Sequence, residues 1–149
     1  MTTGLPVFDR TLQETNLWLK ELEAELGASR QQAYGALRAG FRTLRDRLPA
    51  ETALNLADQL PLLLRGVYLE GWRFYDKPTG ERSIKAFADA IREQLPPDFP
   101  ADGEKVARAV FHAMRHQMND MEVDKVLGHL PAPIRELARD APRPSPPLG

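Results

Sequence analysis

The 149-residue chain contains no cysteine, and it has only three serines and three histidines. The absence of cysteine excludes disulfides, iron–sulfur clusters, cysteine-bearing zinc sites and thiol nucleophiles, and it permits a reducing compartment. No apolar run approaches the ~20 residues of a membrane span, and the N-terminus lacks a basic start followed by an apolar core. We therefore expect a cytoplasmic protein with no membrane segment.

Neither sign of charge is in excess, because 20 Lys and Arg residues face 21 Asp and Glu residues, for a net charge of -1. The chain therefore has no global field that would attract nucleic acid or anionic lipid, and such binding would need a local patch. The hydrophobic content of 42% argues against disorder in the body of the chain. A chain of this length can bury roughly two thirds of its unfolded surface, so we expect one compact body.

Apolar spacing and capping residues predict a chain of helices. The first runs from Phe8 to Leu26 and ends at Gly27, and Ser29 with Gln32 forms a capping box that opens the second, as far as Leu48. Further helices are expected at 51–59, 62–70, 83–95, 104–118, 122–129 and 131–139. Because no segment shows the alternation of a strand, the fold class is all-α, with about eight helices.

The second half repeats the plan of the first at a spacing of 70 residues. The matching pairs include Arg38 and Arg108, Phe41 and Phe111, Arg45 and Arg115, Leu60 and Leu130, Pro61 and Pro131, and Arg65 and Arg135. Self-similarity at a fixed spacing predicts two tandem four-helix units, residues 1–74 and 75–140, packed through the helix of 61–72. The proline-rich tail, 141–149, is expected to be extended or flexible.

The pattern Leu-Pro-x-x-x-Arg occurs once in each half, and the first copy lies within QLPLLLRGVYLEGW, residues 59–72. On these residues the chain resembles the DUF2267 family of uncharacterised bacterial proteins, over about Phe8 to Arg139. The resemblance implies an all-α fold and no established activity. The extension from Gly66 to Trp72 has no counterpart after Arg135, so whatever it does is done once.

Two basic stripes are candidate anion contacts. The first contains Arg38, Arg42 and Arg45, and the second contains Arg108, His112 and Arg115. They could hold phosphates, but such faces usually pair with acidic groups or solvate a helix, which is the interpretation we favour.

Arg65 and Arg135 recur at the same distance from a helix start, where the helix dipole would prefer an acid. We expect each to make a structural contact with a carbonyl or carboxylate, and the alternative is anion capture.

Aromatic residues gather after Arg65 and form a candidate partner surface. They are Tyr68, Trp72, Phe74 and Tyr75. The helix that contains them has too many apolar side chains for one face, so it is either buried between the units, which we favour, or it leaves a patch outside. Any aromatic residue left exposed would be suited to anchor a partner.

Signals of catalysis are few. His112 and His116 lie one helical turn apart, but no third ligand accompanies them, so we predict neither a metal site nor a cofactor. The sequence has no phosphate-binding glycine loop and no nucleophile elbow. It therefore predicts a non-catalytic binding or regulatory protein that contacts other proteins or its own copies, and the alternative is anion or nucleic-acid binding through the arginine stripes.

Overall fold

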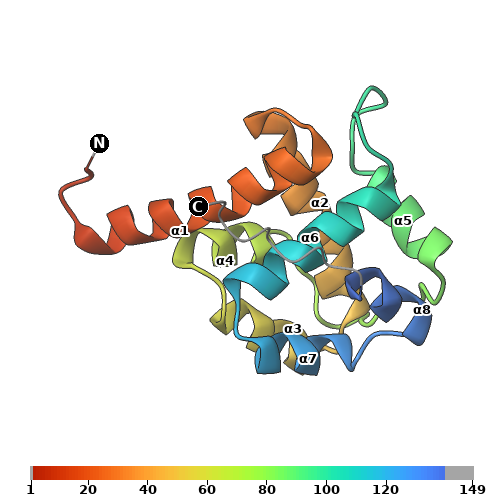
Figure 1. Ribbon diagram of the computed structural model, residues 1–149. Coiled ribbons are helices and arrows are strands. Elements are labelled where there is room, and N and C mark those ends of the chain that lie inside the picture. Colours follow the sequence, from red (N-terminus) through yellow and green to blue (C-terminus); the bar gives the residue numbers. More distant parts are fainter. Residues whose placement is uncertain (1, 140–149) are drawn as a thin grey trace.

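A computed structural model describes residues 2–139, and it confirms the all-α fold class (Figure 1). The α-helices are α1 (Pro6–Leu26), α2 (Arg30–Arg47), α3 (Ala50–Asp58), α4 (Leu62–Leu69), α5 (Ile84–Arg92), α6 (Gly103–Gln117), α7 (Asp120–Leu127) and α8 (Ala132–Arg135). A 3-10 turn, η1 (Glu136–Ala138), follows α8, and residues 2–139 contain no strand.

The helix ends follow the chemistry that the sequence indicates. Gly27 ends α1 in the left-handed conformation, with φ of 60°. Ser29 and Gln32 form the predicted reciprocal capping box at the start of α2. Helix α5 ends at Arg92, three residues earlier than predicted, and its guanidinium donates to the carbonyls of the two following prolines at 2.8 Å each. These bonds stabilise the turn into the next segment.

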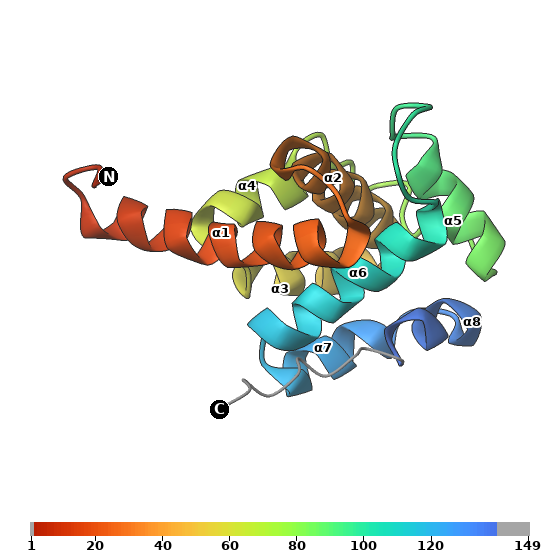
Figure 2. The same ribbon diagram turned by 45° about the horizontal axis from the view of Figure 1, so that its top comes forward.

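Helix α6 holds the two halves of the chain together. It packs against α1, α2 and α5, and α3 lies beside α7 (Figures 1 and 2). The prediction that the halves meet through residues 61–72 is wrong, because the main contacts of α4 are with α1, α2 and α3. The physical reason is the amount of apolar surface: α6 buries nine residues, whereas α4 buries only Leu64 and Tyr68.

Aromatic contacts run through one continuous hydrophobic core. Phe41 lies between Trp18 and Tyr68, with ring centroids 5.6 and 5.7 Å away in edge-on geometry. Phe87 and Phe111 stack with centroids 6.1 Å apart. Because residues from both halves belong to this core, neither half is packed independently of the other.

The spacing of 70 residues relates structure as well as letters. Helices α3 and α7 begin at residues 50 and 120, and α4 and α8 begin at 62 and 132. The order of buried and exposed positions in residues 51–60 is the same as in 121–130. The division into units 1–74 and 75–140 stays a prediction, and the tail at 141–149 lies outside the described residues.

The first turns of α1 project beyond the other helices, as both views show (Figures 1 and 2). We call this part, from Pro6 to about Leu12, the overhang. Phe8 and Leu12 continue the apolar stripe of α1, but they are 47% and 43% exposed because the body of the protein ends near Thr11.

Candidate functional site

The first arginine stripe holds the end of α4. Arg38 and Arg42 reach the carboxylate of Glu70 at 3.1 and 3.4 Å. Arg45 is buried, and its Nη1 donates to the carbonyl of Tyr68 at 2.8 Å and to that of Glu70. The three guanidinium groups therefore neutralise the acid and satisfy two carbonyls at the end of a helix, as cations near a helix C-terminus do. We call this arrangement the arginine clamp.

The clamp changes the electrostatics of Glu70. The hydrogen bond from Arg38, supported by the charges of Arg38 and Arg42, holds the pKa of Glu70 below its usual range. The extension that occurs once in the chain and the arginine stripe, which look separate in the sequence, thus bind each other. Arg45 was a candidate anion contact, but its burial against α4 removes it from the accessible surface.

The second stripe also has acidic neighbours. Arg108 contacts Glu104 at 3.0 Å, and Arg115 contacts Asp124 at 2.7 Å. These pairs are the kind that the favoured interpretation of the sequence describes, and they leave little uncompensated positive charge on α6.

Two histidines of α6 face two glutamates of α1. His112 Nδ1 lies 2.5 Å from Glu25, and His116 Nδ1 lies 2.7 Å from Glu21. Because an ionised carboxylate only accepts, each Nδ1 donates its hydrogen. No group of three or more metal-binding side chains is assembled within residues 2–139. The histidine pair joins α6 to α1, and the structure brings no further ligand to it.

Tyr68 is fully buried, so it is not part of an accessible partner surface. Its hydroxyl donates to the carbonyl of Ala53 in α3 at 2.8 Å, and burial raises the pKa of Tyr68 well above its usual value. The aromatic ring fits the core position beside Phe41, which explains why the sequence pattern alone could not assign it to the surface.

The other aromatic residues of the candidate partner surface are progressively more exposed. Trp72 is half-buried against the core, whereas Phe74 and Tyr75 are 63% and 70% exposed. Phe74 contacts both neighbouring rings, and the Arg73 guanidinium lies 5.9 Å from the centre of the Tyr75 ring. This cluster lies on the connection between α4 and α5.

Arg65 contacts the end of the preceding helix. Its Nε donates to the carbonyl of Ala57 at 3.0 Å, and its Nη2 lies 3.4 Å from that of Leu60. Arg135 is exposed and borders a surface hollow with Arg115, and within the described part of the chain the carbonyl contact of Arg65 is not repeated there. The two arginines share a position in the sequence but differ in their surroundings.

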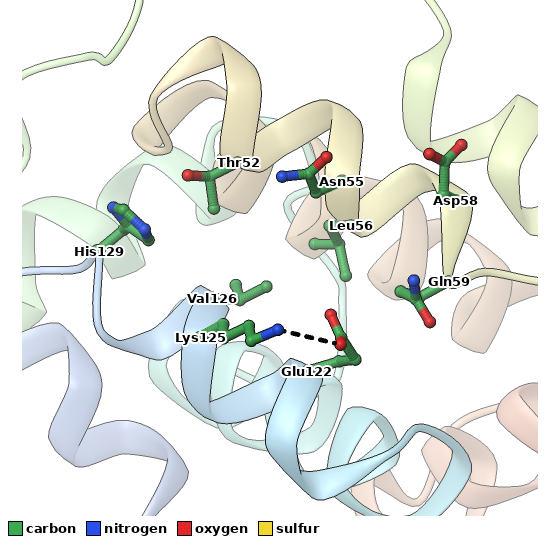
Figure 3. Close-up of a pocket in the computed structure, with 9 residues that line it drawn as sticks. All are labelled: Thr52, Asn55, Leu56, Asp58, Gln59, Glu122, Lys125, Val126 and His129. Atoms are coloured by element: carbon green, nitrogen blue, oxygen red, sulfur yellow. Dashed lines mark hydrogen bonds and ion pairs between the residues drawn. The ribbon is translucent and has the colours of Figure 1, made fainter.

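A polar cleft of about 320 Å³ separates α3 from α7 (Figure 3). Its walls contain four pairs of residues 70 positions apart: Thr52 and Glu122, Asn55 and Lys125, Leu56 and Val126, and Gln59 and His129. Equivalent positions of the two halves therefore face each other across it. Lys125 is neutralised by Glu122 at 3.4 Å, so the cleft has no strong net charge from that pair.

An apolar groove lies where the overhang passes α4. It has a volume of about 450 Å³, and it is lined by Thr3, Phe8, Thr11, Leu12, Leu62, Leu63 and Gly66. Thr11 Oγ1 accepts a hydrogen bond from the Leu63 amide at 2.9 Å, so α1 supplies the cap that Pro61 cannot give to α4. The sequence signal was the excess of leucine after Pro61, which one face could not bury.

These features define an all-α protein whose basic stripes are engaged internally and whose surface has one apolar groove beside a projecting helix. The family model described as "Uncharacterized conserved protein (DUF2267)" matches residues 15–137, which is most of the chain. The protein therefore belongs to the DUF2267 family, as the resemblance in the Leu-Pro-x-x-x-Arg segments indicates. No curated protein matches the chain. None of the described helices is both long and apolar enough to cross a membrane.

Proposed function

We propose that the protein is a non-catalytic helical binding or regulatory module that acts through protein–protein contacts. The observation that supports this most is the apolar groove between the overhang and α4. Phe8, Leu12 and Leu63 are each close to half exposed there, although each could have packed in a core. Clustered exposed apolar side chains typically mark interaction sites in soluble proteins.

The shape of the groove suits a helical or extended apolar segment. Two helices form its walls, and Gly66 leaves open space in the α4 wall, since a Cβ there would meet nothing within 4 Å. Grooves of this kind bind amphipathic segments through a few regularly spaced apolar anchors. The exposed rings of Phe74 and Tyr75 offer a second place where a partner could be anchored.

Site-specific photo-crosslinking in cells tests the proposal. A photoreactive amino acid replaces Phe8 or Leu63 in the groove, and Leu54 or Met121, which are exposed elsewhere, as controls. We expect protein adducts from the groove positions and few from the controls. If neither Phe8 nor Leu63 yields a protein adduct above the control level, this function of the groove is refuted.

The alternative, anion or nucleic-acid binding through the arginine stripes, has weaker support. Arg38 and Arg42 already bind Glu70, and Arg115 binds Asp124. Salt-sensitive binding of a labelled oligonucleotide, lost in the double variant Arg38→Ala/Arg108→Ala, would favour the alternative over our proposal.

The proposal includes a cytoplasmic location. A chain without cysteine has nothing to lose in a reducing compartment, and its core forms without disulfides. Fractionation of cells that express the tagged protein would test this location.

A further inference from the structure

We propose that the occupant of the groove is a second copy of this chain, so that the protein is a two-fold symmetric dimer joined through the overhang and α4. This inference rests on the proposed function, because it names the partner of the same groove. The dimer interface would consist of an apolar patch that we define as Leu5, Val7, Phe8 and Leu12 of the α1 end with Leu62 and Leu63 of α4.

Self-complementary shape is the first argument. A two-fold interface must present a projection and a matching recess on the same surface, because each copy supplies both. The overhang is such a projection, and the groove beside it is the recess (Figures 1 and 2). With a two-fold axis near Leu12, the two overhangs would lie antiparallel, and each would cover the groove of the other copy.

The amount of apolar surface is the second argument. The six side chains of the patch are 43–57% exposed, which together amounts to on the order of 500 Å² of apolar surface. A standard interface buries about 800 Å² on each partner, of which somewhat more than half is apolar. The patch therefore has about the apolar area that a stable dimer of ordinary size requires.

Charge is the third argument. Two copies of the same chain repel if its net charge is large, but here the net charge is -1. The overhang itself bears both signs, with Asp9, Arg10 and Glu14 close together. Electrostatic repulsion thus does not oppose association of two overhangs.

Sedimentation of the full chain tests the proposal, at concentrations from about 1 to about 100 µM. We expect the wild type to be a dimer and Phe8→Glu to be mainly monomeric, with at least a tenfold weaker association. Leu54→Glu is the matched control, because Leu54 is equally exposed on α3, outside the patch, and this variant should remain dimeric.

A second variant blocks the groove without adding charge. Gly66→Leu places a side chain in the open space of the groove and should also give a monomer, whereas Gly35→Leu, at an equally open position on α2, should not. Circular dichroism confirms that both variants fold. This pair keeps the test valid if Phe8→Glu disturbs α1.

Cross-linking gives an independent readout, since the chain has no cysteine of its own. Leu12→Cys should form a disulfide-linked dimer under mild oxidation, and Leu54→Cys should not. A wild type that stays monomeric overturns the dimer but leaves protein binding intact if Phe8 still forms adducts with another protein. A dimer that survives both Phe8→Glu and Gly66→Leu overturns the proposed interface.

Discussion

At the scale of single residues, Arg45 shows how one side chain can serve two helices. It extends from α2, lies almost wholly buried, and donates to carbonyls at the end of α4 while its Nε contacts Asp46 at 3.1 Å. A buried guanidinium is stable only when its donors are satisfied, and here the unpaired carbonyls of a helix end satisfy them. The local sequence predicts the charge but not the carbonyls that it would find.

We predict that Arg45→Met destabilises the fold by about 2–3 kcal/mol, because it removes charged hydrogen bonds and leaves buried carbonyls without donors. Arg115→Met changes the residue 70 positions later, which makes more exposed ion pairs with Asp120 and Asp124, and should cost less than about 1 kcal/mol. Urea unfolding of both variants provides the comparison. Equal losses of stability would contradict the role of Arg45.

Glu70 gives a prediction about pH. Its folded-state pKa lies below the ordinary value of 4.5, chiefly because Arg38 donates to it. The contact therefore stabilises the end of α4 above about pH 4.5, and that contribution is lost as the pH falls through the lower, folded-state pKa. We expect an NMR titration to place the Glu70 midpoint below 4.5, and Arg38→Gln to raise it more than Arg42→Gln. A midpoint that does not respond to Arg38→Gln would argue against the clamp.

At the scale of helices, the closest approach is between α5 and α6. A Cβ on Gly103, the first residue of α6, would lie only 2.0 Å from the backbone oxygen of Ala88 in α5. Backbone cannot move away without separating the two helices. Glycine is therefore required at this position by packing, not by its freedom of rotation.

We predict that Gly103→Ala destabilises the protein by about 2–3 kcal/mol, since it overpacks a helix contact. Gly35→Ala is the matched control, because Gly35 lies inside α2 with open space around it and alanine is the better helix former. That variant should gain about 0.5–1 kcal/mol. Thermal unfolding followed by circular dichroism measures both. A neutral Gly103→Ala would mean that α5 and α6 are less tightly packed than described.

Helix bounds were the most predictable part of the structure, because the residues that set them act locally. Ser29, Gly27 and Ser83 each bond or bend within a few positions of themselves. Packing partners were less predictable. The spacing of Phe8 and Leu12 shows which side of a helix is apolar, but not that the body of the protein ends before it reaches them. The groove and the overhang follow from that missing information.

At the scale of the whole molecule, the halves share one core and are joined by α6. Gly40 of α2 lies so close to Val110 of α6 that a Cβ on the glycine would be 2.6 Å from the valine side chain. Such close contact between helices of different halves couples their stability. The repeat of 70 residues therefore does not imply two independently folding parts.

We predict a single cooperative unfolding transition. Both tryptophans, Trp18 and Trp72, lie in the first half, so fluorescence reports on that half, whereas far-UV circular dichroism reports on all helices. The two signals should change together, and Val110→Ala should shift both by about 2 kcal/mol although it lies in the second half. Separate midpoints for the two signals would show that the halves unfold independently.

The arginine clamp has a consequence for any anion that approaches α2. Glu70 acts as a tethered internal ligand, because its carboxylate already occupies the place between Arg38 and Arg42 where a phosphate would bind. A tethered group competes at an effective concentration of about millimolar or more, so a free anion must displace it and release the end of α4. Occupancy by an outside anion and attachment of α4 are thus mutually exclusive states of the same three arginines.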